Sequence, residues 1–100
     1  MNTFSPDFNR GYADGETNQR SVADQPSAEE MSGHSPEYRL GFVTGWVSAF
    51  AAGDPFAKGS VAGDMGRDYD VPAYKLIKEL GLTSPEHIKM VMDDYEYDGE

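Results

Sequence analysis

The chain is short, acidic and lean in apolar residues, which excludes several classes of protein. It has 100 residues, 38% of them hydrophobic, and a mean hydropathy of −0.63, so it suits one small domain with a modest core. Eighteen Asp and Glu residues oppose eight Lys and Arg, a formal charge of −10, which disfavours direct binding to nucleic acid or anionic membrane. Cysteine is absent, which excludes disulfide scaffolds, thiolate zinc sites and thiol catalysis. With neither a membrane-span pattern nor a signal-peptide pattern, we expect a cytoplasmic protein.

The first half contains an internal repeat, because residues 5–16 and 35–46 align without a gap. In each copy a serine can cap free helix amides, and the proline after it suits the first helical position. These signals predict helices over residues 6–15 and 36–52. The identical positions are Ser5, Pro6, Gly11 and Gly15 in the first copy and Ser35, Pro36, Gly41 and Gly45 in the second.

The four repeated glycines bear on how the two helices would pack. Each interior glycine costs a helix about 1 kcal/mol relative to alanine, so a compensating gain is needed. Close approach of two backbones would supply it, because flanking aromatic rings could interdigitate at about 1.5–3 kcal/mol per buried side chain. We therefore predict an antiparallel pair of helices that cross at their glycines, with a stripe of Tyr38, Phe42 and Trp46 on the second helix. The alternative is that the glycines simply end short helices.

Two segments are predicted to be loops. Residues 16–34 are mostly polar, which is typical of an exposed connector, although Ser27 and Glu30 have capping-box spacing and favour a short helical turn. Residues 53–70 hold four glycines and show no helical or alternating period, which predicts a long loop. The Lys58-Gly59-Ser60 sequence within it does not complete a phosphate-binding motif.

The C-terminal part predicts a helical hairpin over residues 71–92, followed by an acidic tail. Pro72 suits the start of one helix that Gly81 ends, and Ser84-Pro85-Glu86 starts a second helix. A DNA-reading helix-turn-helix is the alternative, but the second helix carries few bases. Residues 93–100 contain five acids and no base, so we expect a tail outside a single, mainly α domain of residues 1–92, whose helix pair spans 6–52.

The sequence contains no clear pattern of catalytic or metal-binding residues. His34 and His87 lack the paired spacing of a zinc site and have no evident nucleophile partner. The order Asp94-x-Glu96-x-Asp98-Gly99 is similar to the start of a calcium loop, but the chain ends before the bidentate Glu of the twelfth position. We therefore expect no enzymatic activity, no metal and no cofactor.

Two motifs in the first half carry a family resemblance. Arg10-Gly11-Tyr12-Ala13-Asp14-Gly15 is followed, after a connector, by Tyr38-Arg39-Leu40-Gly41-Phe42-Val43-Thr44-Gly45-Trp46. Over residues 8–51 this pattern resembles the ribosome modulation factor family, and it also looks like small proteins of bacteriophages. The resemblance implies a helix pair, and a ribosome-binding role for Arg10, Tyr12, Arg39 and Trp46.

Charge decides between the functional hypotheses. The ribosome modulation factor family is basic and contacts ribosomal RNA, whereas residues 1–57 here hold eight acids and three bases, so a ribosome-associated modulator is the alternative. We favour a non-enzymatic protein of a phage or mobile element that imitates nucleic acid. It would bind a basic host protein, such as a nuclease or polymerase component, and inhibit or modulate it. The expected partner-binding residues are Asp93, Asp94, Tyr95, Glu96, Tyr97 and Asp98.

Two further hypotheses about function are consistent with the sequence. In a homo-oligomeric accessory protein, the stripe of Tyr38, Phe42 and Trp46 would pair between chains because a lean core leaves it uncovered. In the other, the negative charge only keeps the protein soluble.

Replacement of Trp46 tests whether the aromatic stripe belongs to the core. Trp46→Ala should lower the free energy of unfolding by about 3–5 kcal/mol if the ring is buried, as measured by urea denaturation followed by circular dichroism. A loss below about 1 kcal/mol would place the ring on the surface.

Overall fold

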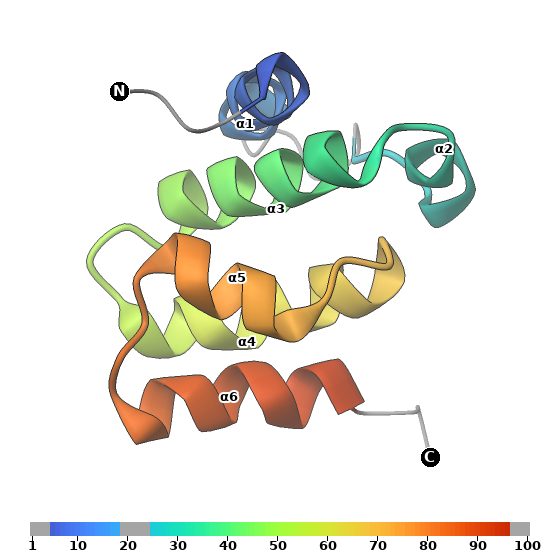
Figure 1. Ribbon diagram of the computed structural model, residues 1–100. Helices are drawn as coiled ribbons and strands as arrows, with labels where there is room; N and C mark the ends of the chain where they lie inside the picture. Colours follow the sequence, from blue (N-terminus) through green and yellow to red (C-terminus); the bar gives the residue numbers. More distant parts are fainter. Residues whose placement is uncertain (1–4, 19–24, 97–100) are drawn as a thin grey trace.

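The fold is mainly α, as the sequence predicts. The computed structural model describes residues 5–18 and 25–96, and within them it contains six α-helices and no strand (Figure 1). None of the described helices is long and apolar enough to cross a membrane. The helices are α1 (Pro6–Asn18), α2 (Ala28–Ser32), α3 (Pro36–Phe50), α4 (Pro55–Asp68), α5 (Ala73–Leu80) and α6 (Pro85–Glu96).

The helices begin where the capping signals place them. The Ser35 hydroxyl accepts a hydrogen bond from the Tyr38 amide at 3.2 Å, and Ser5 caps α1 in the same way. Ser27 accepts from the Glu30 amide at 3.1 Å, so the short turn predicted near residues 27–31 is confirmed as α2. Each cap satisfies a backbone donor that the first helical turn leaves free.

The crossing of α1 and α3 at their glycines is confirmed. A Cβ atom at Gly11 would overlap the backbone of Tyr38 and Phe42, and a Cβ at Gly15 would overlap that of Phe42 and Trp46. The two backbones therefore touch where alanine would separate them, and the reading in which the glycines end short helices is wrong. The gain that offsets the poor helix propensity of glycine is this contact.

The predicted antiparallel direction of this pair is wrong. Contacts advance along α1 and α3 in the same sense, from Gly11 opposite Tyr38 to Gly15 opposite Trp46. The starts of both helices also meet, since the Ser35 hydroxyl donates to the Asp7 carboxylate at 2.8 Å. The chain between the helices, which includes α2, is long enough to bring α3 back to the start of α1, so a short antiparallel turn is not required.

The loop predicted over residues 53–70 is wrong, because most of it forms α4. The Asp54 carboxylate accepts from the Ala57 amide at 3.3 Å and caps the helix. Gly59 and Gly63 do not break α4, because they lie against the backbone of α6. Their four-residue spacing is that of the glycines in α1 and α3. The glycine content of this segment predicted a loop, whereas the glycine spacing indicates close helix packing.

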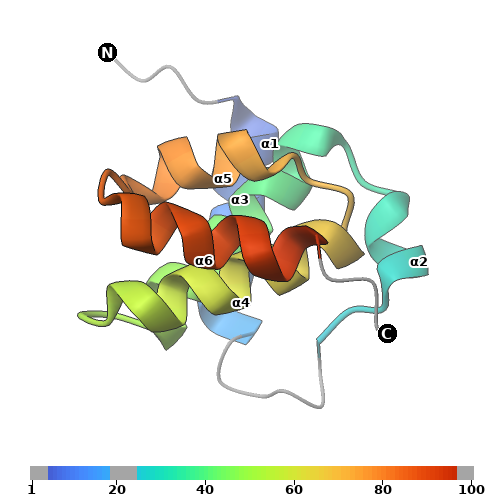
Figure 2. The same cartoon turned by 90° about the horizontal axis from the view of Figure 1, so that it is seen from below.

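The beginning of the predicted acidic tail is also wrong. Helix α6 continues to Glu96 and packs mainly against α4, which Figure 2 shows behind it. The half-buried Tyr95 packs against the C-terminal core cluster, and its ring lies beside Gly66 of α4, which gives the end of α6 a tertiary anchor. Tyr97 and Asp98 lie outside the described residues.

The main core lies between α3 and the second half of the chain. In Figure 1, α1, α3, the α4–α5 layer and α6 follow one another from top to bottom. The aromatic stripe faces this core, with Phe42 fully buried and Trp46 4% exposed, and the Tyr69 ring meets Phe42 edge-on at 6.1 Å. Because the chain's own residues cover the stripe, it cannot pair between chains as the homo-oligomer hypothesis requires.

Alanine substitutions at the crossings test both helix pairs. Gly15→Ala and Gly63→Ala should each lower the free energy of unfolding by about 1–3 kcal/mol, because the added methyl overlaps backbone that can move only with its helix. Gly33→Ala is the matched control, since its nearest contact would be the Glu30 carbonyl at 3.5 Å. Urea midpoints compare the three variants, and equal midpoints for all of them would contradict the packing described above.

Candidate functional site

The candidate site is the acidic end of the molecule, where the last turns of α4 and α6 meet. Two cations, Arg67 and Lys89, accompany the carboxylates of this end. All of these acids except Asp94 are exposed. The acidic end consists of Asp64, Asp68, Asp70, Asp93, Asp94 and Glu96.

Arg67 joins the two helices at this end. Its guanidinium lies 2.6 Å from the Asp64 carboxylate and 3.7 Å from that of Asp68, both near it in sequence. The same group donates to the backbone carbonyl of Asp94 at 3.2 Å, across the α4–α6 contact. Arg67 therefore compensates part of the negative charge and also satisfies a carbonyl in the last turn of α6.

Two tyrosines report the negative field around the acidic end. Burial raises the pKa of Tyr95, and the charge of Asp70 raises it further. Burial also raises the pKa of Tyr69; the hydrogen bond from Gln25 opposes this, and the charges of Asp68 and Glu30 add smaller upward contributions. Glu30 of α2 therefore adds to the negative charge around Tyr69.

The helix dipoles make this distribution of acids unfavourable for stability. The C-terminal end of a helix carries a partial negative charge that favours cations and repels carboxylates by about 0.3–1 kcal/mol each. Helix α6 has no base in its last turn and α4 has only Arg67. Because α4 and α6 run in the same sense, both negative ends and their carboxylates meet at one place.

The predicted partner-binding residues fall into three groups. Asp93 and Glu96 are exposed on α6, and Asp93 forms an ion pair with Lys89 at 2.7 Å. Asp94 and Tyr95 are half-buried beside α4. The remaining two, Tyr97 and Asp98, lie outside the described residues.

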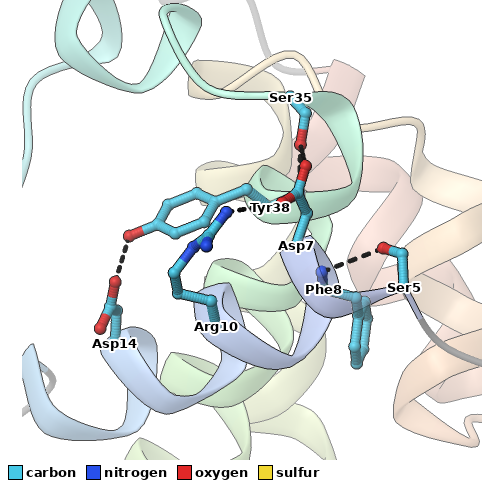
Figure 3. Close-up of polar contacts among 7 residues, drawn as sticks. All are labelled: Ser5, Asp7, Phe8, Arg10, Asp14, Ser35 and Tyr38. Carbon is cyan, nitrogen blue, oxygen red and sulfur yellow. Dashed lines mark hydrogen bonds and ion pairs between the residues drawn. The ribbon is translucent and has the colours of Figure 1, made fainter.

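The four residues of the ribosome-binding alternative do not form one accessible cluster. Trp46 is a core side chain, and Tyr12 is half-buried on α1. Arg10 forms an ion pair with Asp7 at 2.6 Å, shown in Figure 3. Arg39 donates to the backbone carbonyl of His34 at 2.6 Å. The basic side chains are thus held by local acceptors.

Tyr38 lies at the centre of a polar network between α1 and α3 (Figure 3). Its hydroxyl donates to the Asp14 carboxylate, and its ring stacks on His34 with centroids 4.1 Å apart. Burial, the hydrogen bond to Asp14 and the charge of Asp14 raise the pKa of Tyr38 to about 12. This arrangement stabilises the neutral phenol and joins the two helices.

The part of the chain that the structure describes contains no pocket, and no three of its His, Asp and Glu side chains are grouped to hold a metal ion. No protein-family model, curated protein or solved structure matches the chain. The resemblance to the ribosome modulation factor family therefore stays a prediction.

The carboxylates that α4 brings to the site were not predicted from the sequence. Asp64, Asp68 and Asp70 belong to the segment predicted as a loop. A usable signal was present, since Asp54-Pro55 is a helix start and Gly59 and Gly63 repeat the spacing of the first-half glycines. That pattern predicts α4, but not that α4 ends beside α6.

The raised pKa of Tyr38 predicts a loss of stability at alkaline pH. The phenol ionises near pH 10.0 in the unfolded chain and near 12 in the folded protein, so above pH 10 the unfolded state binds fewer protons. Tyr38 should therefore contribute stability fully below pH 10 and lose it as the pH rises towards 12. Urea midpoints across this range should fall less steeply for Tyr38→Phe than for the unchanged protein, and identical slopes would contradict the pKa shift.

Proposed function

We propose that this protein is a non-enzymatic interaction protein that uses its acidic end to occupy a basic, nucleic-acid-binding site on a host protein. The partner class is a cytoplasmic nuclease, polymerase component or related protein, which the interaction inhibits or modulates. A phage or mobile element is the proposed source. The observation that supports the proposal is the convergence of carboxylates on the C-terminal ends of α4 and α6.

The energetics of the acidic end favour a cationic partner over a purely solubilising role. Solubility requires net charge but no concentration of it at two negative helix ends, where carboxylates repel one another and the dipoles. A positively charged groove would relieve both repulsions on binding. It would also accelerate association through electrostatic steering.

The packing of Tyr95 on the core determines which variants can test this function. Deletion of residues 93–100 would remove Tyr95 from the core, so a loss of binding could report misfolding. Neutralisation of exposed side chains avoids this problem. The acidic-end variant is Asp68→Asn, Asp93→Asn and Glu96→Gln, and the matched control is Glu16→Gln, Glu37→Gln and Glu86→Gln, which removes the same charge from exposed positions elsewhere.

The test is affinity purification from host lysate with the unchanged protein, the acidic-end variant and the control as baits. The unchanged protein and the control should recover the same basic nucleic-acid-binding protein, and high salt should release it. The acidic-end variant should bind this partner about tenfold more weakly, with a shallower salt dependence. Equal affinity of all three baits, or recovery of ribosomal proteins by all three, would contradict the proposal.

A further inference from the structure

The first helices of the two halves correspond at five positions. Over residues 8–16, a shift of 48 positions aligns α1 with α4 and superposes their two glycines, whereas the helix starts at Pro6 and Pro55 are 49 positions apart. One aromatic, one basic and one acidic position coincide as well, whereas Asp7, Tyr12 and Asp14 have no counterpart of their kind in α4. The matching pairs are Phe8 and Phe56, Arg10 and Lys58, Gly11 and Gly59, Gly15 and Gly63, and Glu16 and Asp64.

The last helices of the two halves correspond in the same way. A shift of 49 positions aligns α3 with α6 and matches their Ser-Pro-Glu starts at residues 35–37 and 84–86. Phe42 then corresponds to Val91, and both are buried, while the buried Trp46 corresponds to the half-buried Tyr95. The glycines of α3 are not kept, and the second crossing relies on those of α4.

The packing contacts follow this alignment. A Cβ at Gly15 would meet the Phe42 carbonyl and the Trp46 amide, and a Cβ at Gly63 would meet the Val91 carbonyl and the Tyr95 amide. These are corresponding atoms under the two shifts. Gly11 and Gly59 agree less closely: they face the carbonyls of Tyr38 and His87, which also correspond, but the Met90 side chain is nearer to Gly59.

We infer that the chain consists of two copies of one helical unit: α1–α2–α3 is the first unit and α4–α5–α6 is the second unit. In each, two long helices cross in the same sense and a short helix lies in the connection between them. The inference rests on the agreement between the sequence shifts and the backbone contacts. Helix-start signals alone could produce the sequence match, and glycine composition alone could produce the close contacts.

The units stack head to tail. The outer face of α3 packs against α4 and α5 of the next unit (Figure 1), so two different surfaces meet at the contact. Through a contact of this type a third unit would pack on α6, and the stack would continue unless its last helix prevents further packing.

The surface of α6 closes this end. Leu40, Thr44 and Val47 lie on the covered face of α3, with Thr44 and Val47 buried. The corresponding residues of α6 are Lys89, Asp93 and Glu96, all of them exposed. The charged residues that end the stack thus include two carboxylates of the acidic end.

A chain with a third unit tests the duplication. Residues 1–99 are followed by a second copy of residues 51–96, because Gly99 corresponds in sequence to Phe50. The graft Lys89→Leu, Asp93→Thr and Glu96→Val then gives the middle unit the residues of α3. Hydrogen exchange of the added unit, read by mass spectrometry, should slow by about tenfold or more with the graft relative to the extended chain without it.

The controls separate stacking of the added unit from a nonspecific effect of the added apolar side chains. Lys75→Leu and Glu79→Thr make the same kinds of exchange on α5 of the middle unit, away from the corresponding face of α6, and they should leave exchange of the added unit unchanged. In the 100-residue chain the graft should not raise the urea midpoint. If circular dichroism shows that the triple graft does not fold, Glu96→Val alone serves in the same comparison. Equal exchange of the added unit with and without the graft would overturn the inference, whatever the outcome for the acidic end.

Discussion

Backbone contact between glycine-bearing helices is the constraint on which the rest of the structure depends. Alanine at Gly11, Gly15, Gly41 or Gly45 would place a methyl group inside the backbone of the facing helix. The contact lets a chain with few apolar residues bury its aromatic rings, because closely spaced backbones leave little volume to fill. It also explains why α1 contributes little to the main core cluster and yet is held firmly against α3.

The same constraint determines where charge accumulates. A crossing in the same sense requires a return connection, and that connection brings the C-terminal ends of α4 and α6 together. Carboxylates dispersed along the sequence then become neighbours around Arg67. A packing rule that concerns small residues thus has an electrostatic consequence at the end of the molecule, and the proposed binding role rests on it.

Part of the candidate site could be predicted from the sequence. Asp93 and Glu96 were identified from the density of acids near the C-terminus, and their exposure agrees with a surface role. Asp64, Asp68 and Asp70 were not identified, because their proximity to α6 depends on a tertiary crossing. Trp46 shows the opposite case: an aromatic motif that resembles a binding family's signature proves to be a core residue, since large aromatic side chains serve packing and recognition alike.

The sequence by itself determined the helical class, the starts of α1, α2, α3 and α6, and the glycine contact of α1 with α3, because caps, Pro at the first turn and residue spacing act over a few positions. The tertiary structure alone decided the direction of that pair and the anchoring of Tyr95 on the core, and it also stabilises the helix of residues 55–68, which the sequence signals only through Asp54-Pro55 and the glycine spacing. The direction and the anchoring depend on contacts between residues far apart in the chain, which signals acting over a few positions do not encode. A glycine-rich segment has weak intrinsic helix propensity, and only a neighbouring backbone at contact distance makes its helical form the stable one.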